Sequence, residues 1–278
     1  MSTAVVDEPS GRRVHAVIAV LVSLLGVGLG QLYAGWPRAA FGWLLASALL
    51  IAAWGALAAS GPPAFAVLVV AAVAFGFGVL IDSARCGYRH RLLHRSRSVR
   101  VALCVLYVLA ANLLLSYEAL LIRRAWVEPF VIPARSVDMI PTLLPGDYFL
   151  LDHRAFVEQG PRVGDVVVVT WPHIGDASLV RRVAALPGDV VEHDAASKQI
   201  LVNGKAVYGS ATDFAFEPGT VDSGNYFLLC DDLECSRDSR MDGDAPRDLI
   251  YGRATFIYFS RDPATSEIRW DRMGLSIE

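Results

Sequence analysis

Long apolar runs dominate the first part of the chain. Four of them lie at residues 14–34, 39–60, 64–81 and 101–122. Each is close to the ~20 residues that an α-helix needs to cross a bilayer. Helices on the surface of a soluble protein carry a polar face, and these runs barely have one. The pattern predicts an α-helical transmembrane region over residues 1–124, with three or four hydrophobic segments.

The second part of the chain has shorter runs, rich in Val, Ile, Tyr and Phe, which are typical of strands. The predicted strands lie at residues 166–170, 189–192, 199–202, 226–229 and 254–259. Asn203-Gly204 is typical of a hairpin turn, because both residue types tolerate a positive φ. Since no long helix is evident, residues 125–278 are predicted to form one mostly-β domain tethered by the fourth apolar run.

Charge separates the same two regions. The whole chain is 54% hydrophobic and 19% charged, whereas soluble domains are about 25% charged. Residues 1–124 carry 11 basic and four acidic side chains, a net charge of +7, and residues 125–278 carry 14 basic and 24 acidic, a net charge of −10. The basic region is also the apolar one, which argues against nucleic acid as a partner.

Arginines between the third and fourth runs predict the orientation. Six of them lie within residues 85–100, and such a block normally marks a cytoplasmic loop. The β-rich domain is then expected on the extracytoplasmic face. Four full crossings would place Arg12 and Arg13 outside, against the same rule, whereas one re-entrant run would keep the N-terminus inside. The first run is the better candidate for that role, because its glycines at residues 26–30 favour close helix packing.

The four cysteines fall into different compartments. Cys86 lies in the predicted cytoplasmic loop and Cys104 in the membrane region, whereas Cys230 and Cys235 lie in the external domain. A disulfide can persist outside the cytoplasm, so this pair is either bonded or a pair of free thiols. No metal site is expected, because no second Cys/His pair stands at ligand spacing.

Three motifs follow one another in the second region. They are EPFVIPARS with MIPTL at residues 128–143, LVRRVAALPGD at residues 179–189, and SRDSR at residues 236–240. In this order and spacing they resemble the type I signal peptidases, the bacterial leader peptidases. The resemblance covers essentially all of residues 125–278, whereas the membrane region matches only in kind.

The resemblance implies a location, a substrate and a chemistry. Members of this family are membrane-bound serine endopeptidases that cut signal peptides from exported preproteins, with a Ser nucleophile and a Lys base whose burial favours the neutral amine. It implies a multi-pass protein of the bacterial inner (plasma) membrane with a signal-peptidase-like external domain. Its partners would be preproteins and the lipid bilayer, and a substrate would add as a strand beside the nucleophile. The substrate cleft would be formed by Phe130, Ile132, Pro133, Ala134 and Met139.

The nucleophile position departs from the family pattern, which is Ile-Pro-x-x-Ser-Met-x-Pro-Thr. Counting forward from Ile132-Pro133 places Ser136 at the nucleophile. Two extra residues then precede the Met-x-Pro-Thr part, so counting back from Pro141 places Asp138 there instead. A two-residue insertion that retains the serine is the preferred interpretation, and Asp138 is the alternative occupant.

The base position departs as well. The motif places Arg181 where the family has its lysine, and a guanidinium, with a pKa above ~12, keeps its proton in proteins. The only two lysines, Lys198 and Lys205, lie outside the motif. By resemblance, the supporting residues of the site are Ser236, Asp238 and Arg240.

Two functions are consistent with these residues. The first is a signal peptidase I-type serine endopeptidase with Ser136 and Arg181 at the catalytic positions. The alternative is a catalytically silent homologue that binds signal peptides or a membrane partner. No cofactor is expected for either function, and the oligomeric state stays open.

Overall fold

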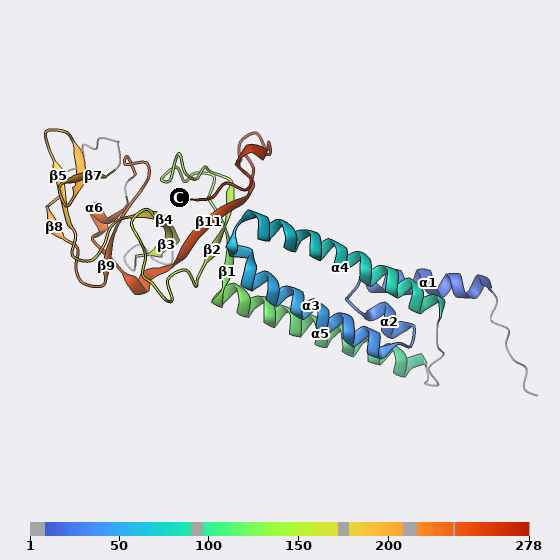
Figure 1. The fold of residues 1–278 in the computed structure, drawn as a ribbon. Coiled ribbons are helices and arrows are strands. Elements are labelled where there is room, and N and C mark those ends of the chain that lie inside the picture. Colours follow the sequence, from blue (N-terminus) through green and yellow to red (C-terminus); the bar gives the residue numbers. More distant parts are fainter. Residues whose placement is uncertain (1–8, 90–96, 172–177, 208–215, 236, 278) are drawn as a thin grey trace, which may run out of the picture. The chain divides into compact units, whose positions relative to one another are not determined.

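The computed structural model describes residues 9–89, 97–171, 178–207, 216–235 and 237–277. Within these ranges the chain forms two compact units (Figure 1). The first consists of Met1–Leu57 and Pro63–Arg123, and the second of Ala58–Pro62 and Arg124–Glu278. The first unit is helical and the second is mostly β, which confirms the predicted fold class.

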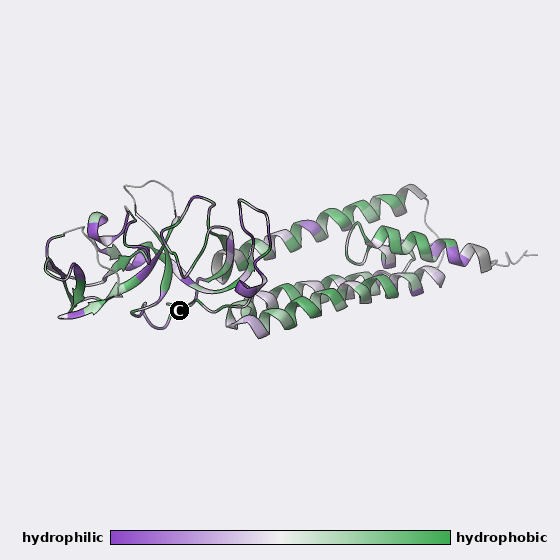
Figure 2. Ribbon diagram, turned by 90° about the horizontal axis from the view of Figure 1, so that it is seen from above, coloured by the Kyte–Doolittle hydropathy of each residue, from purple (hydrophilic) through white to green (hydrophobic). Residues whose placement is uncertain are grey.

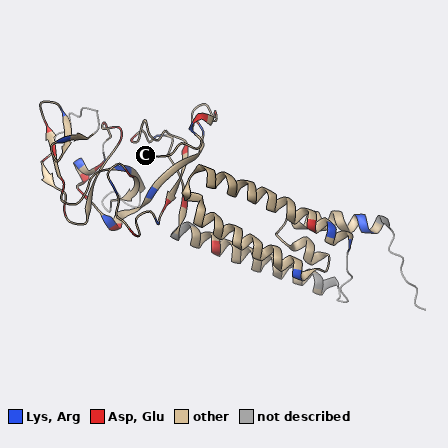
Figure 3. Ribbon diagram, viewed as in Figure 1, with Lys and Arg blue, Asp and Glu red and all other residues tan. Residues whose placement is uncertain are grey.

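Three long apolar helices make up most of the first unit. Its elements are α1 (Pro9–Ser23), α2 (Leu29–Tyr33), α3 (Pro37–Leu57), α4 (Pro62–Tyr88) and α5 (Arg97–Ala125). Among the described helices, three stretches are long and apolar enough to cross a membrane: Pro37–Ser60, Pro62–Tyr88 and Val101–Ile122. They are hydrophobic along most of their length (Figure 2) and carry few charged residues (Figure 3). The second, third and fourth predicted runs are confirmed as candidate spans.

The first predicted run is not one continuous helix. A glycine-rich segment divides it into α1 and α2, and Gly28 there has a φ of 80°, which favours glycine. A Cβ at Gly28 would overlap the Ala40 carbonyl oxygen and the Tyr107 hydroxyl, and one at Gly30 would overlap the Ala19 carbonyl oxygen. The expected close helix packing is therefore confirmed for these two glycines.

A polar cluster joins α2 to α3 and α4. The Gln31 side chain is fully buried, and its Nε2 lies 3.2 Å from both the Val79 carbonyl oxygen and Asp82 Oδ2. Trp43 Nε1 donates to the same carboxylate oxygen at 2.8 Å. Polar groups in an apolar helical region are stabilised when they bind one another, so Asp82 fixes the short helix α2 against its neighbours.

Two antiparallel sheets form the second unit in the part of the chain that is described. The larger has seven strands in the order β1-β2-β11-β3-β4-β9-β10, and the smaller has four in the order β7-β6-β5-β8. Their strands are β1 (Val127–Val131), β2 (Asp147–Asp152), β3 (Val166–Thr170), β4 (Ser178–Ala185), β5 (Val190–Asp194), β6 (Gln199–Val202), β7 (Lys205–Val207), β8 (Gly219–Thr220), β9 (Asn225–Leu229), β10 (Ala245–Pro246) and β11 (Ile250–Ser260). The short helical elements of this unit are η1 (Ala58–Ser60), α6 (Ser239–Asp242), η3 (Arg247–Leu249) and η4 (Trp270–Arg272).

The predicted strands correspond to observed ones. Residues 166–170 and 199–202 coincide with β3 and β6, and the other three predictions fall on β5, β9 and β11. The pattern missed β1, β2, β4, β7, β8 and β10. In β4 the apolar run is interrupted by Arg181 and Arg182, and in β1 Pro129 is unusual within a strand. Pro129 is tolerated because β1 is an edge strand of the larger sheet.

The core of the larger sheet holds the loop that carries the first motif. Met139 and Leu143 from this loop pack with Phe149, Val168 and Ile257 from β2, β3 and β11. The loop that includes residue 138 is therefore anchored by buried side chains on its C-terminal side.

Replacing Gly30 with Ala should destabilise the first unit by about 1–3 kcal/mol, because the new Cβ would overlap Ala19 and Ser23 atoms. Gly26→Ala is the matched control, since a Cβ there meets nothing within 4 Å. Thermal unfolding of the purified full chain in detergent measures both variants. Equal midpoints for Gly30→Ala and Gly26→Ala would show that α2 does not pack as described.

Candidate functional site

Two successive turns shape the loop between β1 and β2 that carries the first motif. Ser136 N donates to the Pro133 carbonyl oxygen at 3.0 Å, and Ile140 N donates to that of Val137 at 3.1 Å. Met139 follows and is buried in the core. One turn therefore precedes Asp138 and a second spans it, and the buried Met139 holds the following residues beside the sheet.

Asp138, rather than Ser136, faces Arg181. Arg181 Nη2 on β4 lies 3.0 Å from Asp138 Oδ2. The Arg181 side chain is 2% exposed and that of Asp138 is 31% exposed. The Ser136 side chain is half-buried, and its hydroxyl makes no hydrogen bond to any residue that the structure describes. Arg181, at the predicted base position, thus forms an ion pair with Asp138, the alternative occupant of the nucleophile position, and not with the preferred Ser136.

All three nitrogens of the Arg181 guanidinium are engaged. Besides the ion pair, Nε donates to the Arg237 carbonyl oxygen at 2.7 Å, and Nη1 donates to the Val180 carbonyl oxygen at 2.5 Å. Burial lowers the pKa of Arg181, whereas the nearby carboxylates of Asp138 and Asp238 raise it. A guanidinium in such surroundings stays protonated, so Arg181 supplies a fixed positive charge and no free lone pair.

Arg182 makes a second ion pair in the same strand. Its Nε and Nη2 donate to the two carboxylate oxygens of Asp231 at 2.7 and 2.8 Å, the bidentate geometry that suits arginine. Arg182 Nη2 also donates to Thr142 Oγ1 at 2.9 Å, and Nη1 to the Gly164 carbonyl oxygen. Arg182 therefore connects the first motif to β4. This role of Arg182 was not predicted from the sequence.

Asp238 and Arg240 form a third pair, which is almost completely buried. Arg240 Nη2 lies 2.8 Å from Asp238 Oδ2, and Arg240 Nε lies 2.9 Å from Asp238 Oδ1. Asp238 also caps α6 by accepting a hydrogen bond from the Arg240 backbone N–H. The pair stabilises the segment whose residue 237 accepts from Arg181. The predicted supporting residue Ser236 lies outside the described residues.

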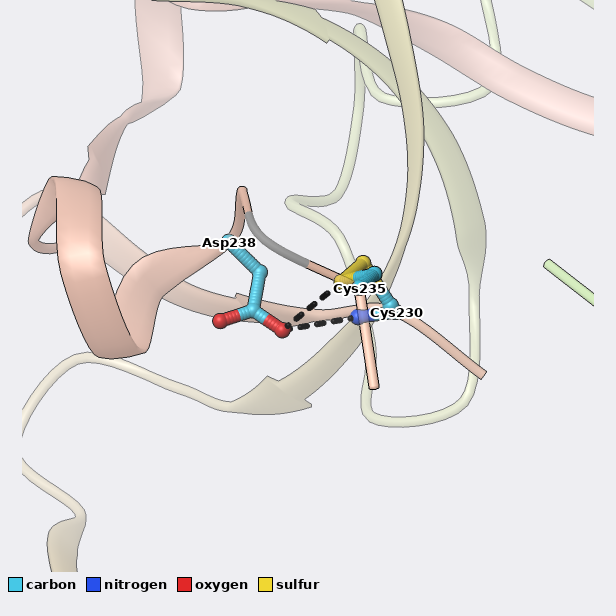
Figure 4. Close-up of side chains that lie close together, drawn as sticks. All are labelled: Cys230, Cys235 and Asp238. Atoms are coloured by element: carbon cyan, nitrogen blue, oxygen red, sulfur yellow. Dashed lines mark hydrogen bonds between the residues drawn. A yellow bond between two sulfur atoms is a disulfide. The ribbon is translucent and has the colours of Figure 1, made fainter. Parts of the chain in front are cut away.

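A disulfide joins Cys230 and Cys235 beside Asp238 (Figure 4). Asp238 Oδ2 accepts from the Cys230 backbone N–H at 3.2 Å and lies 3.5 Å from Cys235 Sγ. The second distance is a contact rather than a hydrogen bond, because a disulfide sulfur carries no proton. The closed disulfide also leaves no thiolate for a metal. Within the loop, Asp232 N donates to the Asp138 carbonyl oxygen at 2.9 Å, which links the disulfide loop to the ion pair.

The five residues predicted to form a substrate cleft differ in exposure. Ile132 and Met139 are buried in the core, so their side chains do not line an open surface. Pro133 and Ala134 are exposed, and Phe130 is half-buried against Phe149. In the described part of the sheet, β1 pairs with β2 alone, so its other edge is open to an added strand.

Comparison with known proteins gives a consistent result. The profile of the family "Signal peptidase, peptidase S26" matches residues 100–259. A signal peptidase I of Pseudomonas aeruginosa is 30% identical, covering 57% of this chain and 75% of its own length. A probable signal peptidase I-1 of Synechocystis is 32% identical, covering 56% of this chain and 80% of its own. A crystal structure of a signal peptidase I from Enterococcus faecalis aligns with 34% of this chain and 97% of its own, at 21% identity and a TM-score of 0.29.

Replacing Asp238 with Asn should destabilise the second unit by about 3–5 kcal/mol, because it leaves the buried Arg240 guanidinium without its counter-charge. Arg253→Gln is the control, since that side chain is 45% exposed and lies 3.6 Å from Asp165, and exposed pairs contribute about 0–1 kcal/mol. Chemical denaturation of the full chain, followed by circular dichroism, distinguishes the two. A loss below about 1 kcal/mol for Asp238→Asn would contradict the supporting role of this pair.

Proposed function

This chain belongs to the signal peptidase family, peptidase S26, and on that premise we propose that it binds the signal peptides of exported preproteins without cleaving them through a serine–lysine dyad. The proposal is the silent-homologue alternative that the sequence left open. In this function the protein still binds the family's substrates, but it does not cut them.

The ion pair between Asp138 and Arg181 carries this proposal. In place of a hydroxyl and a neutral amine, the two positions hold a carboxylate and a guanidinium at 3.0 Å. A carboxylate has no proton to lose before attack, and a guanidinium does not accept one. Loss of a general base costs roughly 10²–10⁴ in rate, and here the nucleophile is replaced as well.

Peptide binding is supported by the geometry around this pair. Strand β1 leaves one edge unpaired among the described strands, and an extended peptide can add to such an edge through main-chain hydrogen bonds. Pro133 and Ala134 continue from this strand as exposed, small or compact residues. A peptide on this edge would extend toward Asp138, which lies midway along the loop between β1 and β2.

A second candidate is cleavage of the same peptides with Ser136 as the nucleophile. Family membership favours it, as does the Ser136 hydroxyl, which is not bonded to any described residue. This function needs a base other than Arg181, whose three nitrogens all donate hydrogen bonds.

We further propose that the protein spans the bacterial inner membrane several times, with residues 125–278 on the extracytoplasmic face. With three spans and the arginine-rich residues 85–100 inside, the N-terminus would lie in the cytoplasm, which the positive-inside rule supports. The segment Ala58–Pro62, between the first two candidate spans, belongs to the second compact unit. Its place there supports a location on the same side of the membrane as the β-rich domain.

The wild-type chain in detergent should not cleave a preprotein that bears an Ala-x-Ala site, whereas the double variant Asp138→Ser with Arg181→Lys should gain measurable turnover. The double variant restores a hydroxyl and an amine that can lose its proton at facing positions. Arg181→Lys alone should remain inactive, because Asp138, the residue that contacts Arg181, carries no hydroxyl. The assay is appearance of mature product on a gel.

Asp138→Ser with Arg181→Met is the matched control, since it supplies the hydroxyl without an amine. Wild-type turnover that disappears in Ser136→Ala would refute the silent-homologue proposal in favour of the second candidate. Cleavage by Arg181→Lys alone would identify Ser136 as the nucleophile.

Reporter fusions test the membrane topology. Alkaline phosphatase, which is active only outside the cytoplasm, should be active when fused after residue 278, and green fluorescent protein should fluoresce when fused before residue 1. Because the arginine-rich block orients the helices, replacing its six arginines with Gln should reduce the fraction of molecules that insert in this orientation. An inactive C-terminal phosphatase fusion on the intact chain would contradict the proposed topology.

A further inference from the structure

The Asp138 carboxylate has one oxygen engaged and one available. Oδ2 accepts from Arg181 at 3.0 Å, whereas Oδ1 makes no hydrogen bond within the described part of the chain. The side chain is 31% exposed. The ion pair therefore presents the oxygen of a carboxylate, and so negative charge, to whatever lies over it.

The positive partner cannot compensate for this charge at the surface. The Arg181 side chain is 2% exposed, and its Nε and Nη1 are directed to the carbonyl oxygens of Arg237 and Val180. To reach a ligand, the guanidinium would have to break these hydrogen bonds. The accessible end of the pair is anionic even though the pair as a whole is neutral.

Cutting a signal peptide from its preprotein changes the charge at the cleaved bond. Hydrolysis adds water across the C–N bond, leaving a carboxylate on the upstream fragment and an ammonium group on the downstream one. Under the proposed function, a bound peptide has the carbonyl of that bond over Asp138. An intact preprotein presents a neutral amide to Asp138, whereas a cleaved signal peptide presents a second carboxylate.

We propose that Asp138 makes this site selective for intact preproteins over cleaved signal peptides. Two carboxylates in contact repel each other, most strongly where one of them is partly buried. The selectivity rests on the proposed peptide-binding function and adds to it the chemical state of the ligand. The site would hold a preprotein before processing and release the signal peptide afterwards.

Three fluorescein-labelled peptides test this selectivity with the full chain in detergent at pH 7. The first ends at the last residue of an Ala-x-Ala signal peptide as a free carboxylate, the second is its carboxamide, and the third continues past the cleavage site. Fluorescence anisotropy should show the second and third binding at least roughly tenfold more tightly than the first, equivalent to about 1.4 kcal/mol. Equal affinities for all three would overturn the inference and leave the proposed function standing.

Substitutions of Asp138 test whether this residue causes the selectivity. Asp138→Asn should remove the difference between carboxylate and carboxamide, and Asp138→Glu should retain it. Arg135→Gln is the matched control, because it removes an exposed charge from the same loop. A difference that persists in folded Asp138→Asn would overturn the inference.

Wild-type protein provides a test that does not depend on a variant folding. Because salt screens the repulsion between partly exposed charges, the ratio of the two affinities should fall as ionic strength rises from 20 to 500 mM. A ratio that is insensitive to salt would contradict an electrostatic origin. If none of the three peptides binds, the proposed function fails and the selectivity fails with it.

Discussion

A guanidinium buried in a sheet needs a carboxylate beside it, and the arrangement of the second unit follows from this requirement. Arg181 lies on β4, between β3 and β9, and is 1% exposed. A buried ion without a partner costs several kcal/mol. Asp138 supplies that partner from the loop after β1, which fixes the loop against the sheet.

Two more buried arginines near Arg181 are likewise paired with aspartates. The Arg182–Asp231 pair links β4 to the segment after β9, and the Arg240–Asp238 pair stabilises the next turn of that segment. The Cys230–Cys235 disulfide closes the loop between them, and Asp232 in that loop donates to the Asp138 backbone. These buried ion pairs therefore connect the loop after β1, strand β4 and the disulfide loop.

Under the proposed function, Asp138 and Arg181 stand at the two positions of the dyad, and their charges compensate each other. Arginine in place of lysine alone would bury a permanent charge opposite a neutral serine. Aspartate in place of serine alone would put a carboxylate beside an amine, which would hold its proton and lose its basicity. With both present, the charges compensate each other, and neither side chain has the proton chemistry of a hydroxyl and a free amine.

The sequence was sufficient for features that depend on local pattern. The apolar runs at residues 39–60, 64–81 and 101–122 predicted α3, α4 and α5, and β3 and β6 were predicted with their observed bounds. The pattern could not show that the first run is broken, because that depends on how closely Gly28 and Gly30 approach their neighbours.

The choice between Ser136 and Asp138 was also beyond the sequence. Spacing allowed both, and only the fold of the loop shows which of the two side chains contacts Arg181. The turn from Ser136 to Pro133 and the buried Met139 bracket Asp138. The carboxylate that results beside Arg181 compensates its buried charge. These are tertiary constraints, which act between segments far apart along the chain.

The central claim is that Asp138 and Arg181 act as one ion pair. A double-mutant cycle on unfolding free energy, with Asp138→Asn, Arg181→Gln and the combined variant, measures it most directly. Because Asp138 is 31% exposed and solvent screens part of the interaction, the account predicts a favourable coupling of about 1–3 kcal/mol. A coupling indistinguishable from zero would contradict the pairing on which the proposed function and its selectivity rest.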